Sequence, residues 1–403
     1  MWIPLVGLPW ILLAPEGGGA AGASAGLARG SNAFGFELWR RLPERQANLA
    51  ISPASLALAL IMTGAGARGE TATQMQRVLH LGAPAEALLA AAGGLARELA
   101  DPARPVVLRI ANRLFGEQTQ RFEAAYRDAL SGAFGAPLEP VDFKAAAEQA
   151  RERINAWVEA ETQQRIRGLV PQGGVDVATR LVLVNALYFL GDWAEPFDPA
   201  RTHPAPFQLS AGARVEVPTM RQTGTLPYAK RDGFAAVELP YRGGELAMLL
   251  VVPDGPQGLA VLEKAVDAAW LARLAAALTP QLVQVHLPRF EVKPARSLAV
   301  GPALQELGMR LAFDPARADF GGIARWRSPE ERLCLGEVFH QAFVKVDEQG
   351  TEAAAATAVA MLAGGAPPRP VQFVADRPFL FFLRDRRSDL VLFMGRVADP
   401  RGG

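Results

Sequence analysis

The chain has 403 residues, is 50% hydrophobic and 21% charged, and carries a formal net charge of +1. This length and hydrophobic content suffice for a large buried core, and the length alone would allow two or three domains. The balanced charge, without runs of like charge, gives no sign of a nucleic-acid partner. The single cysteine, Cys334, cannot form an intramolecular disulfide, and its apolar, strand-like surroundings favour a buried, inert thiol.

The first 30 residues differ in composition from the rest of the chain. An apolar stretch, Met1 to Leu13, is followed by Ala- and Gly-rich sequence, as in a secretory signal peptide cleaved near Ala23 or Ala25. The stretch is too short for a membrane span, although it also lacks the basic start of a typical signal peptide. We therefore expect residues 1–30 to be a signal peptide and low-complexity tail of a secreted or extracytoplasmic protein, with a cytoplasmic location as the alternative.

From residue 31 onward, helical and strand patterns follow one another without a linker, which predicts a single α+β domain over residues 31–403. Ser52 followed by Pro53 predicts a helix cap and first helical turn. Apolar residues at helical spacing predict helices over 32–41, 55–62, 122–130 and 145–164. Alternation or apolar runs predict strands over 106–115, 180–189, 237–253 (a hairpin pair around two glycines), 283–290 and 342–347.

Two glycine-rich motifs fit catalytic signatures but lie in the wrong context. The Gly-x-Ser-x-Gly pattern around Ser24 requires a preceding strand, and here it lies in the tail. Residues 64–69 fit the dinucleotide-binding fingerprint but follow a helix-like run, where the fingerprint requires a strand. We therefore expect no metal, no small-molecule cofactor and no enzymatic activity. The hypothesis that the protein is an esterase predicts that Ser24→Ala abolishes turnover of an ester substrate.

The most informative stretch is residues 342–368. It begins as an alternating strand, breaks at Gly350, continues in small residues, and ends in Gly-Gly and Pro-Pro. Its four consecutive alanines could form a helix, but no apolar stripe of helical period crosses them. Alternate residues of a strand lie on the same face, and here one such face would carry only small or apolar side chains: Thr351, Ala353, Ala355, Thr357, Val359 and Met361. That face would allow the segment to be buried as a strand between two existing strands.

Residues 348–357, Glu-Gln-Gly-Thr-Glu-Ala-Ala-Ala-Ala-Thr, resemble the reactive-loop hinge of inhibitory serpins. The stretches 48–56, 185–189, 379–382 and 392–400 resemble further signatures of that family, so the resemblance covers nearly the whole chain from Ser31. It implies the serpin fold, an α+β fold with three β-sheets, a surrounding set of helices and an exposed reactive-centre loop.

The resemblance also implies roles for particular residues, none of them catalytic. It assigns the hinge to Glu348, Gly350, Thr351, Glu352, Ala353, Ala354, Ala355, Ala356 and Thr357. It places Ser52, Ser55, Asn185 and His340 in a polar cluster (the family's shutter) beneath the main sheet, where they govern strand separation. It places Trp193 at the top of that sheet (the breach), where insertion starts, and Arg289 beside Glu348 as its ion-pair partner. No acid lies at the spacing of a Ser-His-Asp triad, so the cluster is predicted to be a latch.

The implied function is suicide inhibition by a monomer that forms a covalent complex with a target serine protease. The cleaved loop would insert into the main sheet of a fold that is held kinetically. Family loop length predicts Gly364–Gly365 as the scissile bond, with Ala363, Leu362 or Met361 as alternative positions. Small residues there suit an elastase-like or subtilisin-like target, and Leu or Met would suit a chymotrypsin-like one. The alternative is a non-inhibitory carrier, storage protein or chaperone of the same fold, whose hinge would typically be bulky, charged or proline-bearing.

Overall fold

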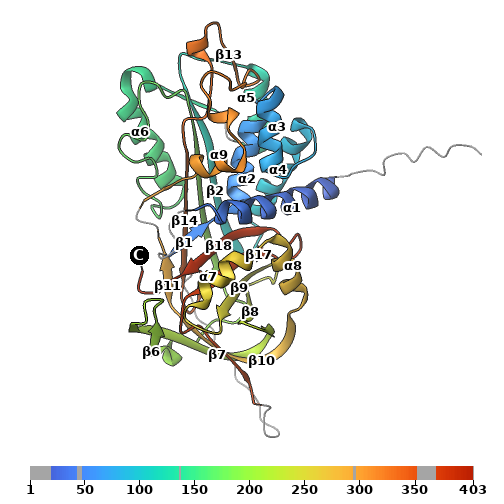
Figure 1. Ribbon diagram of the computed structural model, residues 1–403, viewed down its shortest axis with the longest axis vertical. Helices are drawn as coiled ribbons and strands as arrows, with labels where there is room; N and C mark the ends of the chain where they lie inside the picture. Colours follow the sequence, from blue (N-terminus) through green and yellow to red (C-terminus); the bar gives the residue numbers. More distant parts are fainter. Residues whose placement is uncertain (1–19, 43–47, 136–137, 294–295, 352–368, 403) are drawn as a thin grey trace, which may run out of the picture.

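The computed structural model describes residues 20–42, 48–135, 138–293, 296–351 and 369–402, and every structural statement below concerns these ranges. Helices lie around and between three β-sheets in an elongated molecule (Figure 1). The α-helices are α1 (Ala20–Trp39), α2 (Pro53–Gly64), α3 (Gly69–Val78), α4 (Ala85–Leu99), α5 (Ala124–Phe134), α6 (Phe143–Glu161), α7 (Gly258–Ala265), α8 (Ala268–Ala276) and α9 (Gly301–Leu307). The three-sheet α+β architecture expected from the sequence is confirmed.

A seven-stranded sheet forms the centre of the upper half in Figure 1, with the strand order β11-β14-β5-β2-β4 and with β12 and β15 attached beside it. Its strands are β2 (Val106–Glu117), β4 (Glu139–Val141), β5 (Leu181–Asp192), β11 (Phe290–Val292), β12 (Leu298–Ala299), β14 (Val338–Val346) and β15 (Gly350–Thr351). The neighbours β5 and β14 are parallel and pair directly, from Leu183 opposite Val338 to Tyr188 opposite Phe343. We call this boundary between β5 and β14 the seam.

The two faces of this sheet belong to different hydrophobic clusters, because side chains alternate along each strand. Val182, Val184 and Ala186 of β5 pack with Ile154 and Val158 of α6. The intervening residues of β5, which include Leu183 and Leu187, join the larger cluster to which α2 contributes. Every residue of β5 from Leu181 to Phe189 is therefore buried, which explains its continuous apolar sequence.

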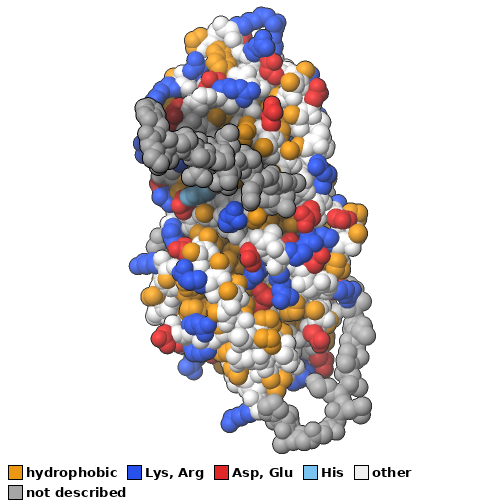
Figure 2. All heavy atoms as spheres, turned by 90° about the vertical axis from the view of Figure 1, so that its right-hand side faces the viewer, with side chains coloured by type: hydrophobic (Ala, Val, Ile, Leu, Met, Phe, Trp, Pro, Cys, Tyr) orange, Lys and Arg blue, Asp and Glu red, His pale blue; other side chains and the backbone are white. Residues whose placement is uncertain are grey.

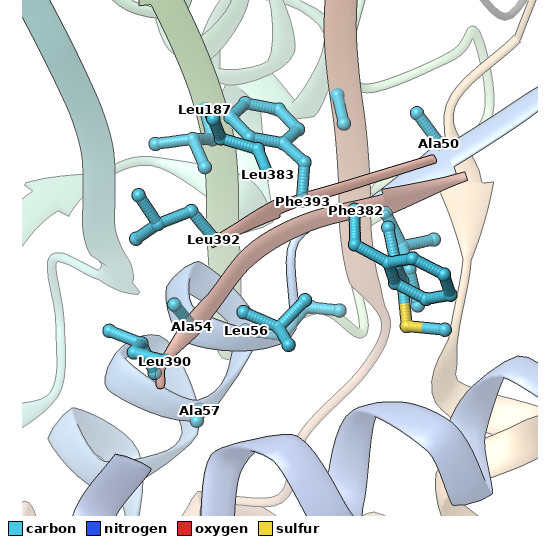
Figure 3. Packing of buried hydrophobic residues seen from close by; sticks show 14 of the residues in the cluster. Ala50, Ala54, Leu56, Ala57, Leu187, Phe382, Leu383, Leu390, Leu392 and Phe393 are labelled. Carbon is cyan, nitrogen blue, oxygen red and sulfur yellow. The ribbon is translucent and has the colours of Figure 1, made fainter. Parts of the chain in front are cut away.

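A nine-stranded sheet fills the lower half in Figure 1, in the order β1-β18-β17-β9-β8-β7-β10-β16 with β6 beside β7. Its strands are β1 (Leu49–Ile51), β6 (His203–Gln208), β7 (Arg214–Arg231), β8 (Phe234–Pro240), β9 (Leu246–Pro253), β10 (Thr279–Pro288), β16 (Val371–Val374), β17 (Phe379–Asp385) and β18 (Val391–Val397). Figure 3 shows the apolar layer that joins the two sheets, in which Leu56 of α2, Leu187 of β5 and Leu392 of β18 belong to one cluster. A third sheet consists of β3 (Arg121–Phe122) and β13 (Ala324–Arg325).

Two details differ from the sequence expectations. Helix α1 begins at Ala20, inside the expected tail, and Leu27 is buried in the core, because alanine-rich sequence forms helix readily once one face can be buried. Cys334 lies in a loop before β14 and is only partly buried, so the strand expected around it is wrong. Burial still raises the pKa of the Cys334 thiol, which keeps it protonated.

The visible surface carries mixed charge. Figure 2 shows Lys and Arg side chains interspersed with Asp and Glu over the face it displays, in agreement with the near-zero net charge. Within the described ranges, no helix is both long and apolar enough to span a bilayer. The same residues contain no group of His, Cys, Asp or Glu arranged to bind a metal ion.

Candidate functional site

The hinge enters the central sheet at the carboxyl end of β5, at one end of the seam. A turn closes where the Asp347 N–H donates to the carbonyl of Gly350 (2.9 Å), and the chain then pairs with β5 as the short strand β15. This strand runs antiparallel to β5, with Thr351 opposite Gly191. Only glycine fits at position 350, because a Cβ there would lie 2.0 Å from the carbonyl oxygen of Gly191.

Two aromatic side chains support this turn. Trp193, which is 1% exposed, donates its backbone N–H to Gln349 O (2.8 Å) and its indole Nε1–H to Asp347 O (3.0 Å). The ring of Tyr241 stacks on Trp193 with a centroid distance of 4.5 Å and an interplanar angle of 20°. Trp193 therefore bonds the hinge backbone at two carbonyl groups, those of Asp347 and Gln349.

The ion pair expected between Arg289 and Glu348 is present. Arg289 nitrogens lie 2.7–2.9 Å from the Glu348 carboxylate oxygens, and the Thr202 hydroxyl donates to Oε1 at 2.5 Å. Burial raises the pKa of the Glu348 carboxyl, but the hydrogen bonds from Arg289 and Thr202 and the charge of Arg289 outweigh it, so the pKa lies below its usual range. The base of the loop is thus anchored through a nearly buried, ionised carboxylate.

The polar cluster lies on one rung of the central sheet. His340 of β14 is directly opposite Asn185 of β5, and Asn185 is directly opposite Asn112 of β2. The three side chains join with Ser52 and Ser55 at the start of α2, and all five residues are at most 7% exposed. The bond between His340 Nδ1 and Asn185 Oδ1 (2.5 Å) crosses the seam.

Every polar group of this cluster finds a complementary partner. Asn185 Nδ2 donates to Ser55 Oγ (2.6 Å) and to Asn112 Oδ1 (2.5 Å), and Asn112 Nδ2 donates to the carbonyl of Ser55 (3.3 Å). Ser52 caps α2 by accepting from the Ser55 N–H (3.1 Å), as its position before Pro53 predicts. Such complete pairing is what a buried polar cluster requires to be stable.

The network also fixes the protonation of His340. The backbone N–H of Ser52 donates to Nε2 (3.1 Å), so Nε2 accepts and Nδ1 carries the proton that Asn185 Oδ1 accepts. Burial lowers the pKa of His340 to about 3. The contacts of His340 given by the described residues contain no carboxylate, whereas the histidine of a Ser-His-Asp triad is oriented by one.

Three contributors to these sites escaped the sequence analysis. Asn112 lies in an alternating strand, where an Asn is ordinarily solvent-facing, and only the register with β5 brings it to Asn185. Tyr241 lies just after β8, and its bridge to Trp193 together with the contact of its hydroxyl with that of Thr351 brings it to the hinge. Thr202 is brought to Glu348 from a loop far away in sequence. No signal in the sequence alone would have singled out these three.

Several predicted residues lie outside the described ranges. They are Glu352, Ala353, Ala354, Ala355, Ala356 and Thr357 of the hinge and the predicted cleavage positions Met361, Leu362, Ala363, Gly364 and Gly365. The structure therefore gives the entry of the loop into the sheet and its exit toward β16.

Comparison with known proteins agrees with this geometry. The family model described as "Serpin (serine protease inhibitor)" matches residues 29–400. The chain is 36% identical to leukocyte elastase inhibitor from Equus caballus over 384 residues, covering 93% of this chain and 99% of that protein. It is also 36% identical over 383 residues to Serpin B9 from Homo sapiens, again covering 93% and 99%. Among solved structures, human thyroxine-binding globulin complexed with thyroxine matches with a TM-score of 0.84 and 25% identity, covering 94% of this chain and 99% of that one. The chain therefore belongs to the serpin (serine protease inhibitor) family, and not to a family of enzymes.

Proposed function

We propose that this protein is a suicide-substrate inhibitor of serine proteases that traps the acyl-enzyme by inserting its cleaved loop into the seam. The observation that carries the proposal is the position of β15. Gly350 and Thr351 pair antiparallel with β5 at the end of the parallel β5–β14 pair, so continued pairing would lead the following residues between those strands. The small residues that follow in the sequence suit such a narrow site.

In the proposed mechanism, the protease serine attacks the carbonyl of the scissile residue, and the peptide bond breaks to leave an acyl-enzyme. The freed N-terminal half of the loop then extends β15, while β5 and β14 separate. Each inserted residue gains about 0.5–1.5 kcal/mol of net hydrogen bonding, so about a dozen residues supply on the order of 10 kcal/mol, less the entropy of ordering them. Insertion must precede hydrolysis of the acyl-enzyme for the protease to be trapped.

We propose an elastase-like, subtilisin-like or chymotrypsin-like target. The small residues Gly364 and Gly365 at the predicted bond support the first two, and the relative named leukocyte elastase inhibitor supports the first. The test is a denaturing gel of the purified protein with one protease of each type. A band at the summed mass supports trapping, and the mass of the released C-terminal peptide locates the bond. Cleavage without such a band by all three would contradict the proposal.

The substitution Thr351→Arg tests insertion directly. Thr351 is already 1% exposed in the uncleaved chain, so an arginine could keep this place in the sheet only by being buried without a partner, which costs several kcal/mol and opposes pairing of the hinge with β5. We expect the variant to be cleaved as a substrate while the yield of covalent complex falls. Val261→Arg, at a position on α7 that is 71% exposed, should trap as well as the parent protein. An unchanged complex yield in Thr351→Arg would contradict insertion through the seam.

A non-inhibitory carrier is the competing function, and the likeness to thyroxine-binding globulin supports it at the level of fold. Heating separates the two. An inserted loop makes the cleaved chain more heat-resistant than the intact one, whereas a carrier with a non-inserting loop shows equal heat resistance before and after cleavage.

We also propose that the protein is secreted, on the basis of the apolar stretch from Met1 to Leu13. Cleavage near Ala23 or Ala25 would fall within the range of α1 and would leave the buried Leu27 in place. N-terminal sequencing of exported protein tests this, and a cytoplasmic product that retains Met1 would contradict it.

A further inference from the structure

The uncleaved chain already holds Thr351 inside the central sheet. Thr351 is 1% exposed, and its backbone lies opposite Gly191 of β5. Its hydroxyl lies 2.7 Å from the hydroxyl of Tyr241, which is itself fully buried. The two hydroxyls satisfy one another in a place that water does not reach.

The tyrosine is held rigidly in that place. Its ring stacks on Trp193 and contacts the ring of Phe189 edge-on, with a centroid distance of 4.9 Å and an interplanar angle of 80°. Gly191 leaves the room for it, because a Cβ there would lie 3.0 Å from Tyr241 Cδ1 and 2.7 Å from Phe189. The position of the tyrosine hydroxyl is therefore set by packing before the loop arrives.

We propose that Tyr241 is a positioning residue that docks Thr351 before cleavage and thereby sets the fraction of attacking protease that is trapped instead of released. The inference rests on the proposed inhibitory function and adds a specific determinant to it. Trapping and hydrolysis of the acyl-enzyme compete, and a docked first residue lets insertion start without a separate search for the seam. The docked state depends on both hydroxyls, because removing one leaves the other buried and unpaired.

Deuterium uptake by the segment 347–351 of the uncleaved, full-length protein tests the docking itself. We expect Tyr241→Phe and Thr351→Val each to raise the exchange rate of this segment about two- to tenfold, since each leaves one buried hydroxyl unpaired. The double variant leaves none unpaired and should exchange more slowly than either single variant. Tyr126→Phe is the matched control, because it removes another buried hydroxyl, which donates to Met62 O at 2.8 Å far from the hinge.

The proposal is overturned if segment 347–351 exchanges no faster in Tyr241→Phe than in Tyr126→Phe. It is also overturned if the increase in exchange rate in the double variant equals the sum of the increases in the two single variants. A general loss of packing would give such a sum, whereas a hydroxyl pair gives partial rescue.

The second measurement is the number of inhibitor molecules consumed for each protease molecule trapped. Each single variant should raise this number relative to the parent protein and to Tyr126→Phe, and an unchanged number would overturn the link to trapping. If the parent protein itself forms no covalent complex, the proposed function has failed, and the exchange rates still decide whether Tyr241 docks Thr351.

Discussion

Replacing His340 by glutamine should remove a pH dependence of stability that the parent protein carries. The folded state holds His340 neutral, with a pKa of about 3, whereas an unfolded histidine titrates near its ordinary value of about 6.5. Between these values the unfolded chain binds more protons than the folded one, so stability is full above pH 6.5 and falls as the pH is lowered. From pH 7 to pH 5, the loss works out at about 2 kcal/mol.

Glutamine suits this test because it does not titrate and offers one acceptor and one donor to the partners of His340. Its oxygen can accept from the Ser52 N–H, and its amide can donate to Asn185, as the imidazole does. A loss of about 2 kcal/mol lowers the thermal midpoint of a chain of this size by about 2–3 °C. Scanning calorimetry at pH 5, 6 and 7 should show this fall of the thermal midpoint with decreasing pH in the parent protein. The contribution of His340 to that slope should be absent in His340→Gln.

The control is His286→Gln in β10. Burial and the charge of Arg221 also lower the pKa of His286, so lowering the pH reduces the stability of the fold through this histidine as well. His286 lies outside the polar cluster. The His286→Gln variant should keep the part of the slope that belongs to His340. Parallel pH profiles for the parent protein and His340→Gln would refute the reasoning that burial and the Ser52 N–H keep this histidine neutral.

Two further substitutions test the base of the loop. Arg289→Gln should lower the free energy of unfolding by about 1 kcal/mol, a modest value because the Arg289 side chain is 47% exposed. A double-mutant cycle with Glu348→Gln, measured by thermal midpoints, should recover this coupling between the two residues. Independent effects of the two substitutions would argue against the ion pair. Gly350→Ala should expel the hinge from β5, because its Cβ would lie 2.0 Å from Gly191 O, and should speed deuterium uptake there. Gly224→Ala, where a Cβ meets open space, should leave that uptake unchanged, and equal behaviour of the two variants would contradict the steric argument.

The sequence was most informative where one physical cause dominates. The apolar run of β5 predicted a buried strand, because both faces of that strand are covered and no position needs to be polar. The Ser52 cap and the break at Gly350 were likewise local, since a cap and a close backbone approach each depend on one residue type. Element boundaries were less certain: β5 continues past Phe189 to Asp192 because it pairs with β2 as far as Gly191 and with β15 at Gly191 and Asp192.

The contacts that remained invisible depend on register between distant strands. Asn185 was identified only through family resemblance, and Asn112 not at all, although the two are opposite one another. Neither composition nor periodicity reveals which residue of one strand pairs with which residue of the neighbouring strand. The same holds for Tyr241 and Thr351, whose hydroxyls meet only because the hinge turns back toward β5.

The parallel pairing at the seam has a consequence for association between copies of the chain. Backbone groups exposed by opening β5 and β14 would pair with any strand of small residues, whether it came from the same molecule or from another. The chain's own loop is tethered to β14 by the turn at Asp347 to Gly350, which gives it an effective concentration in the millimolar range. If the loop inserts as proposed, self-insertion would prevail in dilute solution, and exchange of loops between molecules would become competitive only when the protein is concentrated or the tethered strand is occupied.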